Sequence, residues 1–215
     1  ARNPDRFFVF GMADWRREGY YEEAVTLMRR GFKGLKVPAA RLPKDFLGRQ
    51  EFHRVLDEME QNSVLLGIEL IDGDAQTAMM EEIAQEHPRL CIVIGHFGMV
   101  TRPNWMSQIR LALHDNVYIE SGGITWLFNS EFYPFHSAVR AIRKAADAVG
   151  MEKLMWGSDY PRTITAITYK MSYDFLFKTD LLTGEELQML LGDNARRVFG
   201  FGRLEELPYI KNMSE

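Results

Sequence analysis

The sequence predicts a mixed α/β fold built on a parallel β-sheet. Short apolar runs rich in β-branched and aromatic residues begin 25 to 37 positions apart along the chain. Each run is followed by a longer stretch in which apolar residues have helical spacing. Continuous apolar strands joined by crossover helices form parallel sheets that the helices cover. Two architectures fit this pattern, a doubly wound sheet and a (β/α)8 barrel.

The predicted elements alternate along the whole chain. The apolar runs predict strands over residues 7–13, 32–37, 63–70, 90–96, 116–121 and 153–159. The helical spacing predicts helices over residues 20–30, 49–61, 74–86, 104–114, 135–149 and 185–199. The second helix carries a clear apolar stripe at positions i, i+3, i+4 and i+7, made by Phe52, Val55, Leu56 and Met59. Thr183 can cap the last helix, because its hydroxyl accepts from free backbone N–H groups.

The positions of polar residues favour the barrel. His96, Glu120 and Asp159 stand at the carboxyl ends of their predicted strands. Lys36 and Glu69 stand close to such ends. Barrel enzymes gather their catalytic groups from the ends of several strands at one face. A doubly wound sheet concentrates its signal in a glycine-rich turn, and neither the G-x-G-x-x-G pattern nor the P-loop pattern occurs here.

The number of predicted units sets the expected extent of the barrel. A complete barrel has eight strands and needs roughly 250 residues, and the pattern supplies six strands. We therefore expect the chain to supply about strands 3 to 8, with two further units preceding Ala1. Residues 1–201 are expected to form this N-terminally incomplete barrel, and residues 202–215 a C-terminal tail. Barrel mouths with aromatic loops often meet a partner, so we expect a homodimer.

Composition excludes several classes of protein. The chain has 215 residues, with 26 Lys and Arg against 30 Asp and Glu, and a net charge of −4. Binders of nucleic acids or membrane surfaces carry a basic excess instead, and no apolar run reaches the ~18 residues of a spanning helix. The single cysteine, Cys91, excludes an internal disulfide framework. We expect a cytoplasmic protein that acts on a small molecule.

Two strand-end residues are candidates for catalysis. His96 lies between Gly95 and Gly98 and could serve as a metal ligand or a general base, because imidazole exchanges protons near neutral pH. Asp159, in Trp156-Gly-Ser-Asp-Tyr-Pro161, could bind a metal or accept a proton from water. The structural alternatives are a histidine that ties down the next loop and an aspartate that caps one.

Five motifs together resemble one known family. They are Gly34-x-Lys36, His87-Pro-Arg-Leu ahead of Ile92-Val-Ile-Gly-His96-Phe-Gly98, Asn116-Val-Tyr-Ile-Glu-Ser, Trp156-Gly-Ser-Asp159-Tyr-Pro161 and Gly192-Asp-Asn194-Ala-Arg-Arg-Val-Phe199. In this order and spacing they resemble the amidohydrolase-related family of metal-dependent barrel enzymes, which includes decarboxylases and lactone hydrolases. The resemblance covers about residues 1–201, from the family's third barrel strand onward.

The resemblance implies a metal site with two departures from the family pattern. Asp159 matches the family's metal-binding Asp of strand 8, and His96 matches the strand-6 His that often activates metal-bound water. No counterpart of the first-strand His-x-His is present, and Gly67 stands where the strand-5 His is expected. Glu69 points the same way as Gly67 in a strand. It is therefore either a substitute metal ligand or an ion-pair partner of Lys36 or an arginine.

The remaining polar and aromatic candidates are assigned to substrate binding or support. The loop before residue 136 is aromatic, so Trp126 and His136 are expected to wall a substrate ring, with packing against another subunit as the alternative. Arg162 could pair with a substrate carboxylate, or it could be solvent-exposed. Lys36 is expected to carry charge toward the substrate. Glu120 is expected to support the site by accepting hydrogen bonds.

The predicted function is that of an amidohydrolase-like enzyme. We expect hydrolysis of a small carboxylated or lactone-type ring by water activated on a divalent metal, expected to be zinc, with Asp159 and Glu69 as ligands and His96 as base. A metal-dependent decarboxylase of the same family is the alternative, since the motifs do not separate the two reactions. A metal-free or non-catalytic divergent member is the third possibility, motivated by Gly67.

Overall fold

The computed structural model describes residues 3–70 and 75–202 and contains the predicted alternation of strands and helices. The strands are β1 (Phe10–Gly11), β2 (Gly34–Val37), β3 (Leu65–Ile68), β4 (Ile92–Ile94), β5 (Val117–Glu120) and β6 (Leu154–Met155). The α-helices are α1 (Tyr20–Arg29), α2 (Gln50–Gln61), α3 (Ala75–Glu86), α4 (Trp105–Arg110), α5 (Ile124–Leu127), α6 (His136–Val149), α7 (Met171–Asp174), α8 (Gly184–Gln188) and α9 (Asn194–Phe199). No described helix is long and apolar enough to cross a membrane.

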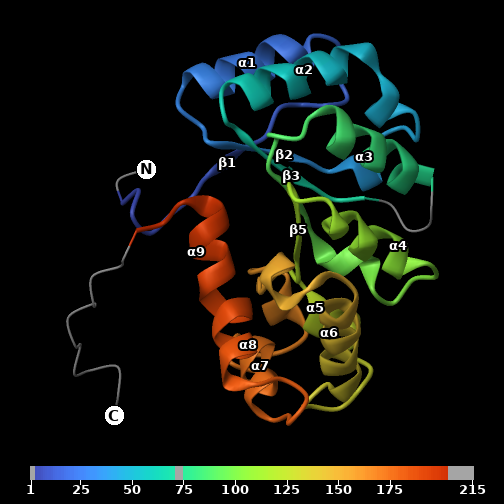
Figure 1. The fold of residues 1–215 in the computed structure, drawn as a ribbon, viewed down its shortest axis with the longest axis vertical. Coiled ribbons are helices and arrows are strands. Elements are labelled where there is room, and N and C mark those ends of the chain that lie inside the picture. The colour runs from blue at the N-terminus through green and yellow to red at the C-terminus, as the bar shows by residue number, and fades with distance from the viewer. Residues whose placement is uncertain (1–2, 71–74, 203–215) are drawn as a thin grey trace.

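The sheet is parallel throughout, and each strand lies beside its neighbours in the chain. The order is β1-β2-β3-β4-β5-β6, with Lys36 opposite Gly67 and Gly67 opposite Val93. Figure 1 shows α1, α2 and α3 along one side of the strands, and α9 on the other side of the view. A doubly wound sheet would reverse its strand order at a switch point. The uninterrupted order confirms the predicted α/β fold and is consistent with part of a barrel wall.

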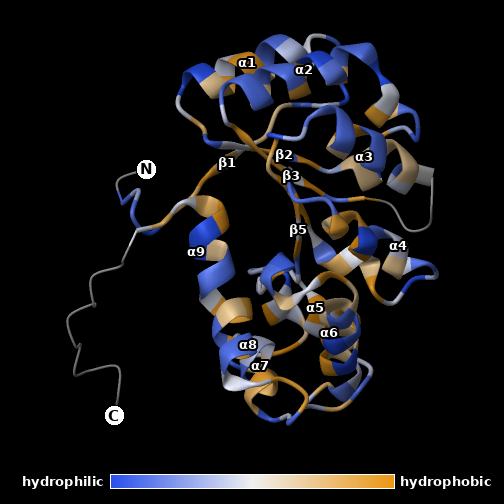
Figure 2. Cartoon of the chain, viewed as in Figure 1, coloured by the Kyte–Doolittle hydropathy of each residue, from blue (hydrophilic) through white to orange (hydrophobic). Residues whose placement is uncertain are grey.

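Alternating side chains give the sheet two apolar faces. Strand residues such as Leu66, Ile92 and Ile119 belong to the main core, together with the stripe of α2. Leu65, Val93 and Met155 belong to a smaller cluster on the opposite face, which we call the inner face, and Phe8, Phe10, Tyr118 and Phe199 pack against it. Figure 2 shows the strands largely in hydrophobic colours and much of α1 and α2 in hydrophilic ones. The inner face is the one that carries the polar strand ends described below.

The strands end earlier than the apolar pattern predicts. His96 is predicted as the last residue of a strand, but β4 ends at Ile94 and His96 begins a 3₁₀ turn that runs to Met99. Its φ of 58° is left-handed, which a strand cannot contain. Likewise β6 ends at Met155, so Asp159 lies in the loop after it and not at its last position. Asp159 also has a positive φ, 53°.

The predicted helix over 185–199 is divided by a π-helical turn, Met189–Asp193, between α8 and α9. The cause is a contact with the sheet, because the backbone N–H of Trp156 donates to the carbonyl oxygen of Leu190 at 2.8 Å. That carbonyl is therefore drawn out of the regular helical ladder. The predicted cap at Thr183 is confirmed: its side chain accepts from Glu186 and the Glu186 side chain accepts from its backbone. Residues 203–215 of the predicted tail lie outside the described residues.

Candidate active site at the strand ends

Polar side chains from three strands meet on the inner face of the sheet. Lys36 lies in β2, Glu69 follows β3 directly, and Glu120 is the last residue of β5. A Cβ added at Gly95, between them, would lie 3.4 Å from Nζ of Lys36, 3.6 Å from Oε2 of Glu120 and 3.7 Å from Cγ of Glu69. Because parallel strands end at one edge, their last inward side chains converge there. Gly95 therefore leaves open the centre of a charged cluster, which we call the mouth.

Glu69 joins two positive groups at the mouth. Its Oε1 lies 3.0 Å from Nζ of Lys36 and 3.3 Å from Nε2 of His96. The hydrogen bond from His96 and the charge of Lys36 lower the pKa of Glu69 to about 2, against the opposing effect of burial. Of the two roles left open for Glu69, the geometry shows the ion pair with Lys36. It also adds His96, which the sequence pattern did not assign as a partner.

The surroundings of His96 favour its protonated form. Nδ1 lies 2.9 Å from the carbonyl oxygen of Gly122, so it carries a hydrogen, and Nε2 faces the Glu69 carboxylate. The hydrogen bond with Glu69 is the largest effect that raises the pKa of His96, and the charge of Asp159 adds to it. A general base must begin neutral. The pairing with Glu69 favours the charged imidazolium over the neutral form that a base requires.

Glu120 is enclosed by glycines. A Cβ at Gly122 would lie 2.8 Å from both carboxylate oxygens of Glu120, and a Cβ at Gly157 would overlap Oε1. Burial raises the pKa of Glu120, while the positive charges of Lys36 and His96 oppose the rise. Gly157 belongs to the Gly-Ser-Asp sequence before Asp159, so the motif provides space for this carboxylate. Glu120 thus lies inside the cluster.

Asp159 reaches the mouth from the loop after β6. Its Oδ2 accepts a hydrogen bond from Nε1 of Trp126 at 3.0 Å, and the guanidinium of Arg162 lies over the Trp126 ring, 5.0 Å from its centroid. The side chain of Asp159 is half-buried, whereas Arg162 is exposed. Asp159 and His96 approach the same stretch of backbone, because Nδ1 of His96 lies 2.9 Å from the carbonyl oxygen of Gly122 and a Cβ added at Gly123 would lie 3.1 Å from Oδ2 of Asp159. Trp126 therefore positions the Asp159 carboxylate.

The predicted role of His136 receives no support from its contacts. His136 is the first residue of α6 and is exposed. Among the described residues, no hydrogen bond or ion pair joins it to Glu69, His96 or Asp159. The aromatic residues before it differ in exposure, since Phe132 is 94% exposed and Phe135 is buried.

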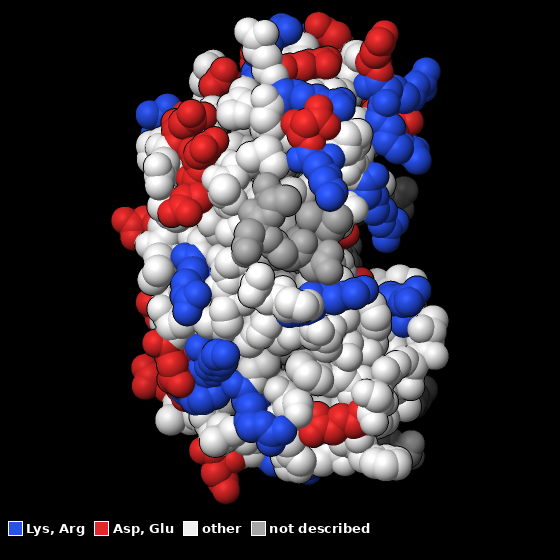
Figure 3. Space-filling view, turned by 90° about the vertical axis from the view of Figure 1, so that its right-hand side faces the viewer, with Lys and Arg blue, Asp and Glu red and all other residues white. Residues whose placement is uncertain are grey.

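A cavity of about 530 Å³ opens beside the mouth. Lys36 and Glu69 line it, together with Asp14, Arg16 and Arg41 from the segments after β1 and β2. Arg16 pairs with Asp14 at 3.1 Å. Sequence reasoning missed these three, although each follows a predicted strand on the side where barrel enzymes carry their catalytic loops. Figure 3 shows one side of the molecule hollowed at its right-hand edge, with Lys and Arg side chains above and below the hollow.

The contacts of Glu69 do not fit its predicted role as a metal ligand. Lys36 and His96 already occupy Oε1 of Glu69, and a positive ammonium 3.0 Å from a ligand oxygen repels a cation. The space above Gly67 is filled, because a Cβ there would lie 2.9 Å from Cε1 of Phe10. Within residues 3–70 and 75–202, the group of three potential ligands whose donor atoms lie within 4.8 Å of one another contains neither Glu69 nor Asp159. It consists of His53, Glu86 and His87.

Solved structures with the same fold include hydrolases and decarboxylases. An amidohydrolase from Burkholderia multivorans with bound zinc is 18% identical over 89% of this chain and 72% of its own, with a TM-score of 0.71. A probable 2-pyrone-4,6-dicarboxylic acid hydrolase from Acinetobacter baumannii is 21% identical over 93% of this chain and 75% of its own, also at 0.71. A 2,6-dihydroxybenzoate decarboxylase from Rhizobium is 17% identical over 93% of this chain and 72% of its own, with a TM-score of 0.64.

These likenesses concern the fold, because identities below a quarter do not carry an activity from one chain to another. No curated protein matches the chain. The family model described as Amidohydrolase matches residues 1–201, the extent over which the sequence motifs resembled that family. The parallel strand order and the polar strand ends agree with this match. The chain belongs to the amidohydrolase family.

Proposed function

We propose that the mouth is the active site of a hydrolase that opens a lactone or similar ester bond in a small carboxylated ring. The observation that carries the proposal is the pairing of His96 with the Glu69 carboxylate, near the loop that also approaches the carboxylate of Asp159. Glu69 favours the protonated form of His96, and Asp159 lies near enough to influence the pKa of His96. Hydrolysis of an ester needs one group to accept a proton from water and another to protonate the leaving oxygen.

Cationic side chains line the cavity beside the acidic Asp14, Glu23 and Glu69, and they support a carboxylated substrate. Arg16, Arg41 and Lys36 line the cavity, and guanidinium and ammonium groups bind carboxylates through charge-assisted hydrogen bonds. In the proposed complex the two arginines bind a carboxylate of the ring, while Lys36 lies at the reacting end beside Glu69. The hydrolase among the similar structures is described as acting on a pyrone dicarboxylic acid, a substrate of this chemical class.

The proposed reaction begins at Asp159. Its carboxylate accepts a proton from water as the water oxygen attacks the ring carbonyl carbon, and the Trp126 indole holds the other carboxylate oxygen in place. The ammonium of Lys36 stabilises the negative charge that develops on the carbonyl oxygen. The bond from carbon to ring oxygen then breaks, and His96 donates its proton to that oxygen. The product carries a new carboxylic acid and a hydroxyl group.

Decarboxylation is the second candidate, and the raised pKa of His96 favours it as well. An imidazolium that protonates a leaving oxygen could instead protonate a ring carbon as carbon dioxide departs. Decarboxylases also occur among the structures of the same fold. The two reactions differ in their products, because hydrolysis consumes water and decarboxylation releases carbon dioxide.

The test is an assay with 2-pyrone-4,6-dicarboxylate and 2,6-dihydroxybenzoate as probes in ¹⁸O-labelled water. We expect the lactone to open with one label in the new carboxyl group. Asp159→Asn should lower kcat by roughly 10²- to 10⁴-fold, the contribution of a general base, while Asp180→Asn, at an exposed residue, should not. Release of carbon dioxide would favour the second candidate, and no reaction would favour a non-catalytic member. Parallel assays with a chelator and with added Zn²⁺ measure the predicted metal dependence.

A further inference from the structure

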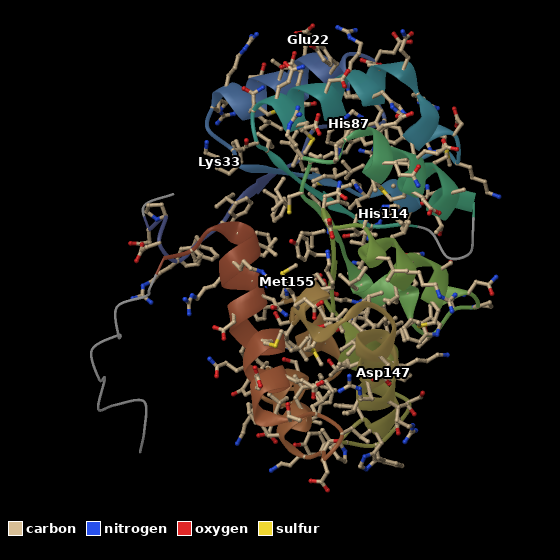
Figure 4. The ribbon with its side chains drawn as sticks, in the orientation of Figure 1. Glu22, Lys33, His87, His114, Asp147 and Met155 are labelled. Atoms are coloured by element: carbon tan, nitrogen blue, oxygen red, sulfur yellow. The ribbon has the colours of Figure 1, made fainter. Side chains whose placement is uncertain are left out.

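A second cluster of ligand side chains lies away from the mouth, in the helical layer. His53 lies in the first turn of α2. Glu86 is the last residue of α3, and His87 follows it directly. One potential ligand atom from each of these residues lies within 4.8 Å of the other two, and Nδ1 of His53 is 3.4 Å from Oε2 of Glu86. Figure 4 shows His87 between α2 and α3. The cluster thus joins two helices that are separate in the chain.

His87 is the unusual member of this cluster. It is only 5% exposed, and its Nε2 has no hydrogen-bond partner among the described residues. Its Nδ1 lies 3.8 Å from Oδ1 of Asp57, one helical turn after His53 in α2. A buried polar group that lacks a partner destabilises the fold. A bound ion that engages the imidazole would remove part of that cost.

We propose that His53, Glu86 and His87 bind a divalent transition-metal ion of the zinc type, which links α2 to α3. Two imidazoles and a carboxylate are ligands that Zn²⁺ accepts in tetrahedral sites. Asp57 or water would complete the coordination. If water does so, Asp57 can orient the His87 ring, as carboxylates do behind metal-bound histidines. The partial exposure of His53, 32% of its side chain, gives the ion access from solvent.

This site is independent of the proposed hydrolase. None of its residues belongs to the mouth, where Glu69 is engaged by Lys36 and His96. Its consequence is structural, because an ion that binds only the folded protein stabilises it. Binding should also weaken on acidification, since metal ligands must be deprotonated.

The test is a Zn²⁺ titration of the chelator-treated protein. Calorimetry measures the affinity, and thermal unfolding measures the change in Tm. At about pH 7.5 we expect the wild type to bind Zn²⁺ with micromolar or tighter affinity and to gain Tm, and we expect the binding to weaken on acidification. The double variant His53→Gln with Glu86→Gln changes exposed or half-exposed side chains, so it should fold. We expect it to bind at least tenfold more weakly and to lose the gain in Tm.

Two controls separate this site from others. His114 and Glu81 form a similar pair, with 3.6 Å between Nε2 and Oε1, so His114→Gln with Glu81→Gln should leave Zn²⁺ affinity unchanged. Glu69→Gln with Asp159→Asn removes the acids predicted to hold an ion at the mouth. No binding by the wild type overturns the proposal. So does binding that survives in the His53 and Glu86 variant or disappears only in the mouth variant.

Discussion

Replacing Glu69 by Gln removes a carboxylate that joins Lys36 and His96. Its Oε1 lies 3.0 Å from the ammonium and 3.3 Å from the imidazole, and its side chain is 19% exposed. The Gln side chain keeps the shape but not the charge. The variant should therefore lose the electrostatic stabilisation of the mouth and, with it, the main interaction that raises the pKa of His96.

The size of the effect follows from the pKa of Glu69, which falls from its usual 4.5 to about 2. At 1.36 kcal/mol for each pH unit, the fall corresponds to about 3 kcal/mol. We expect a loss of about 2–3 kcal/mol in the free energy of unfolding, because some solvent reaches the pair. The lowered pKa of Glu69 stabilises the folded protein fully above pH 4.5, and this stabilisation disappears as the pH falls toward 2. The raised pKa of His96 adds stability below pH 6.5, the usual pKa of histidine. This stability is lost as the pH rises through the pKa of His96 in the folded protein.

The assay is urea unfolding of the wild type and the variant across this range, with His96 titrated by NMR. The difference in stability should be largest between the usual pKa values of the two groups, 4.5 and 6.5, and should vanish near pH 2. The pKa of His96 should fall in the variant. Glu18→Gln, at an exposed residue, is the control for charge alone. Equal stabilities at pH 5.5, or a difference that persists at about pH 2, would refute the ion-pair network.

Two further predictions concern elements around the mouth and the last helix. Gly157→Ala should cost about 1–3 kcal/mol by overpacking, because its Cβ overlaps Oε1 of Glu120. Adding Glu120→Ala should restore part of the loss in urea unfolding, and an unaffected single variant would contradict the enclosed carboxylate. Thr183→Ala should cost about 1 kcal/mol, because the capping box at α8 is lost. Thermal unfolding measures this loss, with the exposed Ser130→Ala as control; equal Tm values would show that the cap contributes nothing.

The positions of the elements could be predicted because they depend on local patterns. The stripe of α2 identifies its buried face, and all of its members are fully buried. The end of a strand was harder to place, as at His96, whose left-handed φ stops the ladder. The division of the last helix at Leu190 depends on a hydrogen bond with Trp156, which is distant in the chain.

The site was predictable in part for the same reason. Lys36, Glu69 and Glu120 could be placed at one edge from the alternation of side chains along parallel strands. Which of these residues form ion pairs could not be predicted, because a pairing depends on distances across three strands. The sequence alone could not show that the space above Gly67 is filled by Phe10, whose ring reaches it from β1, two strands away in the sheet.

The sequence by itself therefore determined the order of strands and helices, the family and the residue types at the strand ends. These follow from periodicity and from motifs that are continuous in the chain. Only the tertiary structure decided that Glu69 binds Lys36 and His96, that Glu120 needs Gly157, and that His53 meets His87. Charge interactions fall off over a few ångströms, so side chains far apart in sequence acquire their chemistry only when the fold sets the distance between them.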